Sequence, residues 1–160
     1  AYEIQVWLEF RRVLFRSCVR SAMLHAIETW ALTKVSESRL LRNDRTMIRW
    51  ICNTKPEDQT STEQLLSKLK IPALNDLMRA SRLRWYGHVV RSDSWMNKCQ
   101  YIKIVSNKGP GRPKKTWEET IRHDRKEWNL TDVDPQDRTI CRAKLQAASN
   151  RPTPRAETET

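Results

Sequence analysis

Long apolar runs are missing from this 160-residue chain, in which no window approaches eighteen consecutive apolar residues. A helix needs roughly 18 such residues or more to cross a bilayer, so we expect no membrane-spanning segment and no membrane partner. Apolar residues make up only 38% of the chain, although seven tryptophans are among them. The chain is long enough for one domain with a core, and this composition predicts a thin core that is spread along helices.

Paired cysteine motifs are missing as well. The chain has four cysteines that lie far apart without any Cys-x-x-Cys pair: Cys18, Cys52, Cys99 and Cys141. Disulfide frameworks and structural zinc sites usually place cysteines at short, recurring spacings. We therefore predict reduced thiols in an intracellular protein and no metal site.

Acidic residues are few relative to basic ones. Thirty Lys and Arg residues stand against nineteen Asp and Glu, which gives a net charge of +11. Such an excess favours a polyanionic partner, and a generic basic surface is the alternative interpretation.

The first seventeen residues are a separate case. Residues 8–17 resemble the in-frame translation of a sequencing-library adapter, and residues 1–4 resemble its upstream part. We therefore treat residues 1–17 as a non-native segment and base no functional argument on them. Their apolar residues still recur at helical spacing, so a helix is expected there. Without the segment, which holds three basic and two acidic residues, the net charge is +10, and a polyanionic partner is still expected.

Apolar residues recur every three or four positions through much of the remaining chain. This spacing predicts a short helix over Cys18–Leu32 and a second helix from Thr33 or Ser36 to about Cys52. Arginines surround the apolar face of the second helix, where they form either a solvated surface or phosphate contacts: Arg39, Arg42, Arg45 and Arg49.

Two capping boxes predict where further helices start. Ser61 with Gln64, and Thr116 with Glu119, have the spacing at which two side chains satisfy each other's free backbone amides. The first box predicts a short helix that ends near Leu69. The second predicts the first helix of a C-terminal pair.

The C-terminal part of the chain is expected to hold a helical pair and a tail. In the first helix, Trp117, Ile121 and Trp128 recur on one side, which we expect to be buried. The Asp134-Pro135 pair predicts the start of the second helix. From residue 148 onward the composition is polar without an apolar period, which predicts disorder over residues 148–160.

The most distinctive stretch is the C-terminal half of a predicted helix that starts near Pro72. It reads Arg82-Leu83-Arg84-Trp85-Tyr86-Gly87-His88-Val89-Val90-Arg91. Trp85 falls on the apolar stripe of this helix, so a place in the core is favoured over stacking on a base. Tyr86 and His88 lie off that stripe and are the better candidates for contact with a strand. Gly87 costs a helix roughly 1 kcal/mol relative to alanine, which a close approach by another backbone would explain.

A basic linker follows at residues 106–115. Glycines and prolines alternate there with cations, a composition that does not form a helix. A Gly-Arg-Pro unit carries little bulk, so it can lie along a phosphate backbone or in a minor groove.

We predict that the helix and the linker together grip a nucleic-acid strand, because they combine cationic and aromatic side chains. The candidate contacts are Arg82, Arg84, Tyr86, His88, Arg91, Lys108, Arg112, Lys114 and Lys115. No catalytic or metal-ligating residue is predicted. His88 in particular has no nucleophile or paired carboxylate beside it in the sequence.

Four blocks of the sequence resemble, in the same order, the C-terminal part of non-LTR (LINE-type, RTE- and jockey-like) retrotransposon reverse transcriptases. The blocks are Glu28–Thr33, Met47–Cys52, Arg82–Arg91 and Gly111–Trp117, and the resemblance covers Cys18 to about Ala147. It implies the helical thumb and a C-terminal extension, which follow the polymerase palm and help to hold the template RNA and the primed DNA target.

The resemblance also implies what this chain lacks. The catalytic site of the family holds two divalent cations, Mg²⁺ in the parent polymerase, through an Asp-Asp pair and a further Asp. This chain has no Asp-Asp pair. The fragment is therefore expected to have no cofactor and no polymerase activity of its own. His25-Ala26 stands where family members usually carry tyrosine and glycine, and Ile140 stands where tryptophan is common, which fits a decayed copy.

These observations predict an all-α fold, an elongated bundle of about five to six helices with a basic Gly/Pro linker and a disordered C-terminal tail. The expected division is a thumb-like region over 18–105, a linker over 106–115, a helical pair over 116–147 and a tail over 148–160. The resemblance implies an intracellular protein of the nucleus and cytoplasm. Its expected partners are an RNA template, a DNA primer or target, and the rest of the reverse transcriptase polypeptide.

Two other functions remain open at this point. A free-standing DNA-binding module could use Gly111-Arg112-Pro113 like an AT-hook, although Pro110 stands where such hooks usually carry arginine. Preference for a narrow A·T groove would favour that function. Alternatively, the helices form a protein-interaction piece that packs on the polymerase palm, in which case the isolated chain would expose its tryptophans.

Overall fold

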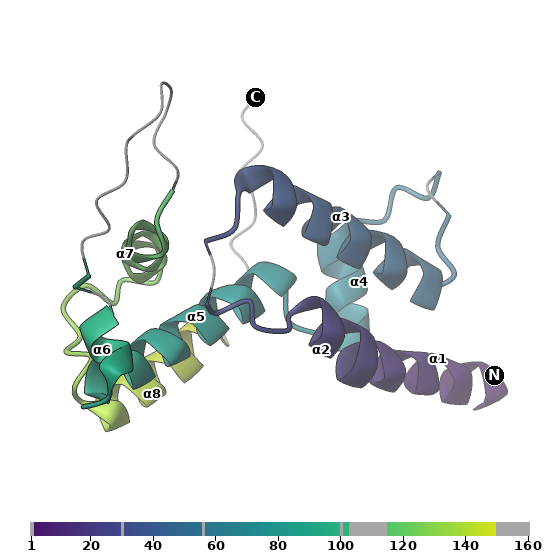
Figure 1. Ribbon diagram of the computed structural model, residues 1–160. Coiled ribbons are helices and arrows are strands. Elements are labelled where there is room, and N and C mark those ends of the chain that lie inside the picture. Colours follow the sequence, from purple (N-terminus) through teal and green to yellow (C-terminus); the bar gives the residue numbers. More distant parts are fainter. Residues whose placement is uncertain (1, 30, 56, 100, 103–114, 150–160) are drawn as a thin grey trace, which may run out of the picture. The chain divides into compact units, whose positions relative to one another are not determined.

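The structure, a computed structural model, describes residues 2–29, 31–55, 57–99, 101–102 and 115–149. These residues form helices and no strands, so the predicted all-α class is confirmed. They contain eight α-helices and one π-helical segment (Figure 1), which is more than the five or six helices expected. A search of the same residues finds no helix with both the length and the hydropathy to cross a membrane.

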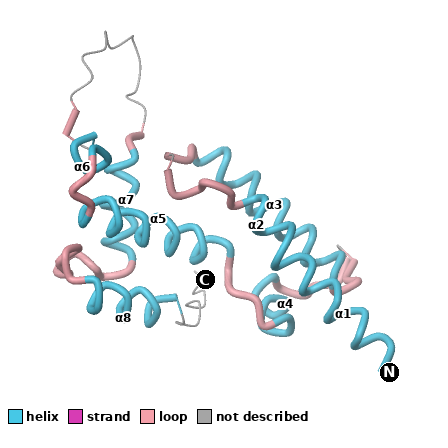
Figure 2. The backbone as a smooth tube through the Cα atoms, turned by 60° about the horizontal axis from the view of Figure 1, so that its bottom comes forward, coloured by secondary structure: helices cyan, strands magenta, loops and turns pink. Residues whose placement is uncertain are grey.

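The helical elements follow one another along the chain. In order they are α1 (Tyr2–Leu14), the π-helical segment η1 (Phe15–Val19), α2 (Arg20–Met23), α3 (Lys34–Ile51), α4 (Thr62–Leu69), α5 (Leu74–Arg91), α6 (Trp95–Cys99), α7 (Trp117–Glu127) and α8 (Arg138–Ser149). Figure 2 shows that α1, η1 and α2 continue into one another without a break. The bounds of α3, α4 and α5 agree with the predicted helices within a few residues.

The chain forms two compact units, each built from segments that are distant in the sequence. Unit 1 takes its described residues from 2–25 and 34–77, with Ser149, and unit 2 takes them from 26–33 and 78–148. This division differs from the expected one, in which residues 18–105 form a single thumb-like region. The reason is that most of α5 shares a core with the C-terminal helices α7 and α8.

Unit 1 has its core between η1, α3 and α4. Five side chains form this core, and each is at most 5% exposed: Phe15, Ile48, Leu65, Leu69 and Ile71. Ile48, Leu65 and Leu69 come from the apolar faces of α3 and α4, so this part of the core follows from the helical spacing that predicted these helices. Phe15 comes from η1, and Ile71 follows the end of α4.

A buried ion pair ties the segments of unit 1 together. Arg20 Nε and Nη2 donate to the two carboxylate oxygens of Asp44, each at 2.8 Å, so α2 is joined to α3 by two parallel hydrogen bonds. Arg20 Nη1 donates to the carbonyl oxygen of Pro72 at 2.7 Å, in the connection between α4 and α5. The guanidinium also lies 5.1 Å from the ring centroid of Phe15. One arginine thus links three separate parts of the unit.

Unit 2 has its core between α5, α7, α8 and the turn before α8. Its buried members are Ala80, Leu83, Ile121, Trp128, Leu130, Val133 and Ala148. The predicted buried side of α7 is confirmed for Ile121 and Trp128, whereas Trp117 is half-buried. Trp117 Nε1 donates to the carbonyl oxygen of Glu28 at 2.7 Å, which holds the turn at residues 26–29 against the start of α7.

Both predicted capping boxes are present. At α4, Ser61 Oγ accepts from the Gln64 amide and the Gln64 side chain accepts from the Ser61 amide, each at 3.2 Å. Thr116 and Glu119 exchange the equivalent pair of hydrogen bonds at the start of α7, also at 3.2 Å. These local interactions set both helix starts.

The predicted helix over Cys18–Leu32 is wrong in its second half. Helical structure ends at Met23, and the chain turns at Ala26, where φ is 55°. Ile27 is 1% exposed, and Glu28 accepts the hydrogen bond from the Trp117 indole. Contacts within unit 2 therefore override the helical spacing of this segment.

The predicted start of the last helix is also wrong. Helix α8 begins at Arg138, and its cap is Asp137 rather than Asp134, because Asp137 Oδ1 accepts from the Thr139 hydroxyl at 2.6 Å and from the amides of Thr139 and Ile140. These hydrogen bonds, that of the Thr139 hydroxyl first, hold the pKa of Asp137 below its ordinary value of 3.8. Asp134 instead accepts from the Gln136 amide within the preceding turn.

Helix α8 also extends beyond the expected end of the helical pair. It ends at Ser149, and Ala148 is 7% exposed in the core of unit 2, so residue 148 is not part of a disordered tail. The rest of the predicted tail, residues 150–160, lies outside the described residues.

Candidate nucleic-acid interface

The motif Arg82–Arg91 lies on α5, and the structure divides its side chains into two groups. One group faces the interior of unit 2, where Leu83 and Val89 are each 5% exposed. Arg84 and His88 are exposed, and Trp85 is half-buried. Of the apolar stripe predicted for this helix, Val89 is buried and Trp85 is only half-buried, and Leu83, which lies outside that stripe, enters the core.

Arg82 was predicted to contact nucleic acid, but the structure places it in the interior of unit 2. It is 4% exposed, and its Nε donates to Asp124 Oδ2 at 2.6 Å, which joins α5 to α7. Arg79 Nε lies 3.7 Å from the other oxygen of the same carboxylate. A buried guanidinium that is paired with a buried carboxylate cannot reach a phosphate without breaking the pair. Arg82 therefore supports the fold and does not belong to the exposed interface.

Tyr86 is held between two side chains of unit 2 rather than being free to meet a strand. Its ring centroid lies 6.1 Å from that of Trp117, and the guanidinium carbon of Arg125 lies 5.7 Å from its ring centroid. Arg125 in turn donates to the carbonyl oxygens of Leu130, Thr131 and Val133. This set of contacts fixes the turn between α7 and α8.

Gly87 was expected to allow the close approach of another backbone segment. It instead leaves room for the side chain of Arg91. A Cβ atom at Gly87 would lie 2.9 Å from Arg91 Nη1. Arg91 Nη1 donates to the carbonyl oxygen of Pro135 at 2.6 Å. The glycine therefore lets the guanidinium of Arg91 cross the helix surface and join α5 to the turn that precedes α8.

Arg84, Trp85 and His88 share one face of α5, and we refer to these three residues as the α5 face. Arg84 and His88 are four residues apart, so they lie one above the other on the helix surface. The rings of Trp85 and His88 have centroids 5.4 Å apart and planes inclined by 42°. Arg84 Nε donates to the carbonyl oxygen of Ala80 at 3.1 Å, which anchors the side chain to its own helix. The face thus presents a guanidinium, an imidazole and an indole together.

The predicted contacts of the linker are only partly described. Lys115 is exposed and directly precedes the cap of α7. Lys108, Arg112 and Lys114 lie outside the described residues, as does the Gly-Arg-Pro unit.

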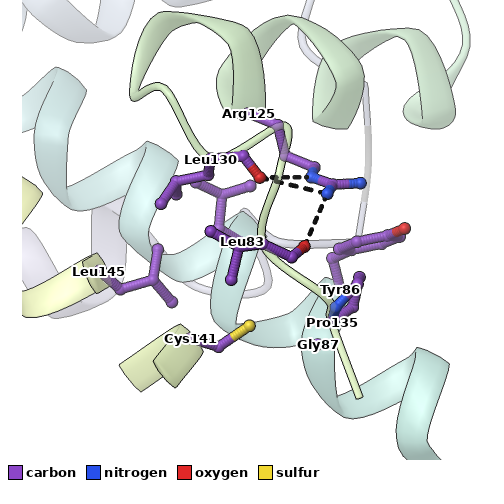
Figure 3. Close-up of a pocket in the computed structure, with 9 residues that line it drawn as sticks. Leu83, Tyr86, Gly87, Arg125, Leu130, Pro135, Cys141 and Leu145 are labelled. Atoms are coloured by element: carbon purple, nitrogen blue, oxygen red, sulfur yellow. Dashed lines mark hydrogen bonds between the residues drawn. The ribbon is translucent and has the colours of Figure 1, made fainter. Parts of the chain in front are cut away.

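A small cavity lies on the core side of α5 (Figure 3). Its lining is mostly apolar and consists of Leu83, Tyr86, Gly87, Arg125, Leu130, Val133, Pro135, Cys141 and Leu145. Its volume of about 30 Å³ leaves room for one or two water molecules and is too small for a nucleobase. Burial raises the pKa of the Cys141 thiol, so this side chain is a neutral thiol at physiological pH. The cavity is therefore part of the packing behind the α5 face.

Titratable side chains do not gather into a metal site within the described ranges. No three His, Cys, Asp or Glu side chains there lie close enough together to hold a metal ion. The four cysteines are unpaired, with Cys18 and Cys99 exposed and Cys52 and Cys141 partly buried.

Asp124 organises the motif but was not singled out from the sequence. It lies three residues after Ile121 and four before Trp128, and therefore on the face of α7 that was predicted to be buried. A carboxylate on a buried face requires a cation opposite it, so this spacing was a usable signal for a buried arginine. It did not reveal which arginine, because Arg79, Arg82 and Arg84 all lie nearby on α5.

Comparisons with known proteins give no match for this chain. No protein-family model matches it, and neither a curated protein nor a solved structure matches it.

Proposed function

We propose that this chain is the thumb and C-terminal extension of a non-LTR retrotransposon reverse transcriptase and that it holds a nucleic-acid strand. The four sequence blocks support the family, and the absence of an Asp-Asp pair limits the chain to binding. The observation that carries the binding role is the α5 face, where Arg84 and His88 are exposed and the half-buried Trp85 lies beside His88. A guanidinium can pair with phosphate, and the rings can stack on bases or sugars.

The buried half of the motif supports this role by holding α5 in place. Arg82 is bonded to Asp124, and Arg91 is bonded to Pro135, so α5 is tied both to α7 and to the turn before α8. Binding side chains on a rigidly held helix keep their relative positions when a ligand binds. One continuous motif thus supplies both the exposed contacts and their rigid support.

The net charge of +10 outside residues 1–17 supports the same proposal. Each phosphate that a protein neutralises releases counterions, so affinity should fall steeply as salt rises. Lys115 is exposed and would add to the interface, and Lys108, Arg112 and Lys114 would extend it along the linker.

The proposal is tested by measuring how the complete chain binds an RNA template annealed to a DNA primer. Fluorescence anisotropy gives the affinity at each salt concentration of a series. Arg84→Gln should weaken binding and reduce the salt slope by about 0.7–0.9, the value for one phosphate contact. His88→Gln should also weaken binding, because it removes a ring that can stack on a base or sugar.

Arg142→Gln on α8 is the matched control, because Arg142 is exposed and its loss removes the same charge from the same unit. We expect it to leave the slope nearly unchanged. Equal slopes for Arg84→Gln and Arg142→Gln would show a generic basic surface instead of an interface. Tighter binding to A·T duplex than to the hybrid, lost in Arg112→Gln, would replace the proposal by the AT-hook-like function.

A second function, packing against the rest of the polymerase polypeptide, is favoured by one observation. Trp95, Tyr101 and Ile102 lie close together in the sequence of unit 2 and are 72%, 78% and 63% exposed. Apolar side chains this exposed often mark a surface that a protein partner covers. Replacement of all three by serine should abolish binding to a separately expressed palm domain while leaving binding to the hybrid unchanged.

A further inference from the structure

One face of α3 in unit 1 is bare along its whole length, although the opposite face is packed. The residues of the exposed face follow one another at spacings of three and four: Val35, Arg39, Arg42, Thr46 and Trp50. All five are exposed, as is Asn43 beside them. On the opposite side, Asp44 and Ile48 are buried, at 4% and 0% exposure. Helix α3, seen in Figure 1, therefore supports unit 1 with one side and presents the other to solvent.

Three cations lie on or beside this face. Arg39, Arg42 and Arg45 are exposed and follow one another every three residues, about 4.5 Å apart along the helix axis. None of them forms an ion pair with any residue that the structure describes. Helix α3 has two acidic residues: Asp44 is buried against Arg20, and the half-buried Glu37 lies two turns before Asp44, on the packed side. The exposed charge of this surface is therefore of one sign.

Arg49 shows what a structural arginine on the same helix does. It donates to the carbonyl oxygens of Lys55 and Thr60, which closes the loop between α3 and α4. Within the described part of the chain, the other three arginines have no equivalent bond. Their free guanidinium groups match a row of phosphates, since guanidinium and phosphate form strong paired hydrogen bonds.

Trp50 lies at the C-terminal end of the same face and is 71% exposed. It is about 16 Å from Arg39 along the helix axis. It is not a member of the core of unit 1, although its neighbours Ile48 and Ile51 pack there. An exposed indole on the same face as Arg39 and Arg42 provides a surface on which an unpaired base can stack.

We propose that Arg39, Arg42, Arg45 and Trp50, here named the α3 face, bind a single-stranded nucleic acid. The three arginines hold successive phosphates, and Trp50 stacks on one unpaired base. A single strand is favoured over a duplex because the bases of a duplex are already stacked. This surface belongs to unit 1, and none of its observations depends on the α5 face of unit 2.

The stacking step is tested with fluorescent oligo-dT and oligo-rU of about 20 nucleotides, and with a blunt duplex of equal length as the second probe. Trp50→Ala in the complete chain should weaken binding of the single strands by about five- to a hundredfold, the range for loss of one stacked base. Binding of the duplex should change by less than about twofold. Trp95→Ala is the matched control, because Trp95 is 72% exposed but lies on α6; it should leave both affinities unchanged.

The phosphate step is tested by the salt dependence of single-strand binding. The variant Arg39→Gln/Arg42→Gln/Arg45→Gln should reduce the slope by about 2, because each phosphate contact on a single strand contributes about 0.7. The control Arg138→Gln/Arg142→Gln/Lys144→Gln removes three exposed charges from α8 in unit 2. It should reduce the slope by less than half as much. Circular dichroism checks that every variant keeps its helix content.

The inference is overturned if Trp50→Ala and Trp95→Ala have equal effects, or if the two triple variants reduce the slope equally. It is also overturned if Trp50→Ala leaves nucleic-acid binding intact and abolishes binding to a polymerase palm domain, which would make the α3 face a protein interface. Loss of binding in Arg84→Gln with no response in the α3-face variants would reject this inference alone and leave the proposed function standing. The reverse result would reject the α5 face and retain the α3 face.

Discussion

Each of the two units contains a buried arginine paired with a buried aspartate, but the two pairs are completed differently. In unit 1, Arg20 makes two hydrogen bonds of 2.8 Å to Asp44 and a third to a carbonyl oxygen. In unit 2, Arg82 makes one hydrogen bond of 2.6 Å to Asp124. In the Arg20–Asp44 pair one guanidinium neutralises one carboxylate, whereas a further cation lies beside the carboxylate of the Arg82–Asp124 pair.

The further cation is Arg79, which lies 3.7 Å from Asp124 and also 3.7 Å from Glu127. Its side chain is 26% exposed, compared with 5% for Arg82. A buried carboxylate can balance only one buried guanidinium, so the additional charge lies where water can reach it. The comparison shows that α5 tolerates many arginines because only one of them is fully buried.

The largest expected effect on stability follows from breaking the Arg20–Asp44 pair. Arg20→Met leaves the Asp44 carboxylate buried without its cation, which should lower the free energy of unfolding by about 3–5 kcal/mol. Guanidinium chloride denaturation measures the loss. Hydrogen exchange then locates it, since the amides of α3 in unit 1 should lose protection before those of α7 in unit 2.

The double variant Arg20→Met/Asp44→Leu is the control for this prediction. It removes both charges, so it should recover most of the stability that the single variant loses. If the amides of α7 lose protection as much as those of α3, the two units unfold together and the comparison between them fails for stability.

A smaller and equal effect is expected at the two capping boxes. Ser61→Ala in unit 1 and Thr116→Ala in unit 2 should each lower the free energy of unfolding by about 1 kcal/mol, because both caps make the same pair of hydrogen bonds at 3.2 Å. Thermal or chemical denaturation measures both. Ser67→Ala, at an exposed position inside α4, is a control that should not destabilise the chain. Clearly unequal losses at the two caps would contradict the prediction.

A still smaller effect is expected at the additional cation of unit 2. Arg79→Met should lower the free energy of unfolding by at most about 1 kcal/mol, because Arg82 still neutralises Asp124 and an exposed ion pair contributes little. The same denaturation experiment measures it. A loss as large as that of Arg20→Met would mean that Arg79, rather than Arg82, is the main partner of Asp124.

The smallest effect is the pH dependence of a single cap. The pKa of Asp137 is lowered in the folded chain, so the stabilisation by its ionised form is complete above the ordinary pKa of 3.8 and is lost as pH falls through the lower folded value. NMR titration of the Asp137 carboxyl and of the first amides of α8 should show both changes at the same pH. The cap of α4 should show no such titration, because neither Ser61 nor Gln64 carries a titratable group. A common titration of both caps would point to global acid unfolding instead.

Local chemistry explains which parts of the fold were predictable. Both capping boxes lie within four residues and make their hydrogen bonds without help from distant segments, so the starts of α4 and α7 followed from sequence. The helix over Cys18–Leu32 was overpredicted because Ile27 and Glu28 make contacts of unit 2 instead of continuing the helix. The last helix began late because Asp137 and Asp134 both have local partners, and spacing alone did not distinguish the cap from the turn.

The candidate interface was less predictable than the helices. Arg84 and His88 are exposed as an interface requires, whereas Arg82, Tyr86 and Arg91 have partners within unit 2. Each of these five residue types can either bind nucleic acid or make contacts within the fold. The choice depends on how α5 is rotated about its axis, and the apolar residues of α5 do not define a single stripe.

The sequence by itself determined the all-α class, most of the helix starts and the excess of positive charge, because these depend on composition and on contacts within one or two turns. Only the tertiary structure decided which arginines are buried. Arg82 and Arg84 are two residues apart on one helix, and the difference between them comes from Asp124, 42 residues beyond Arg82. A charged side chain is buried only where the fold places an opposite charge beside it. For Arg82, that placement depends on the packing of α5 against α7.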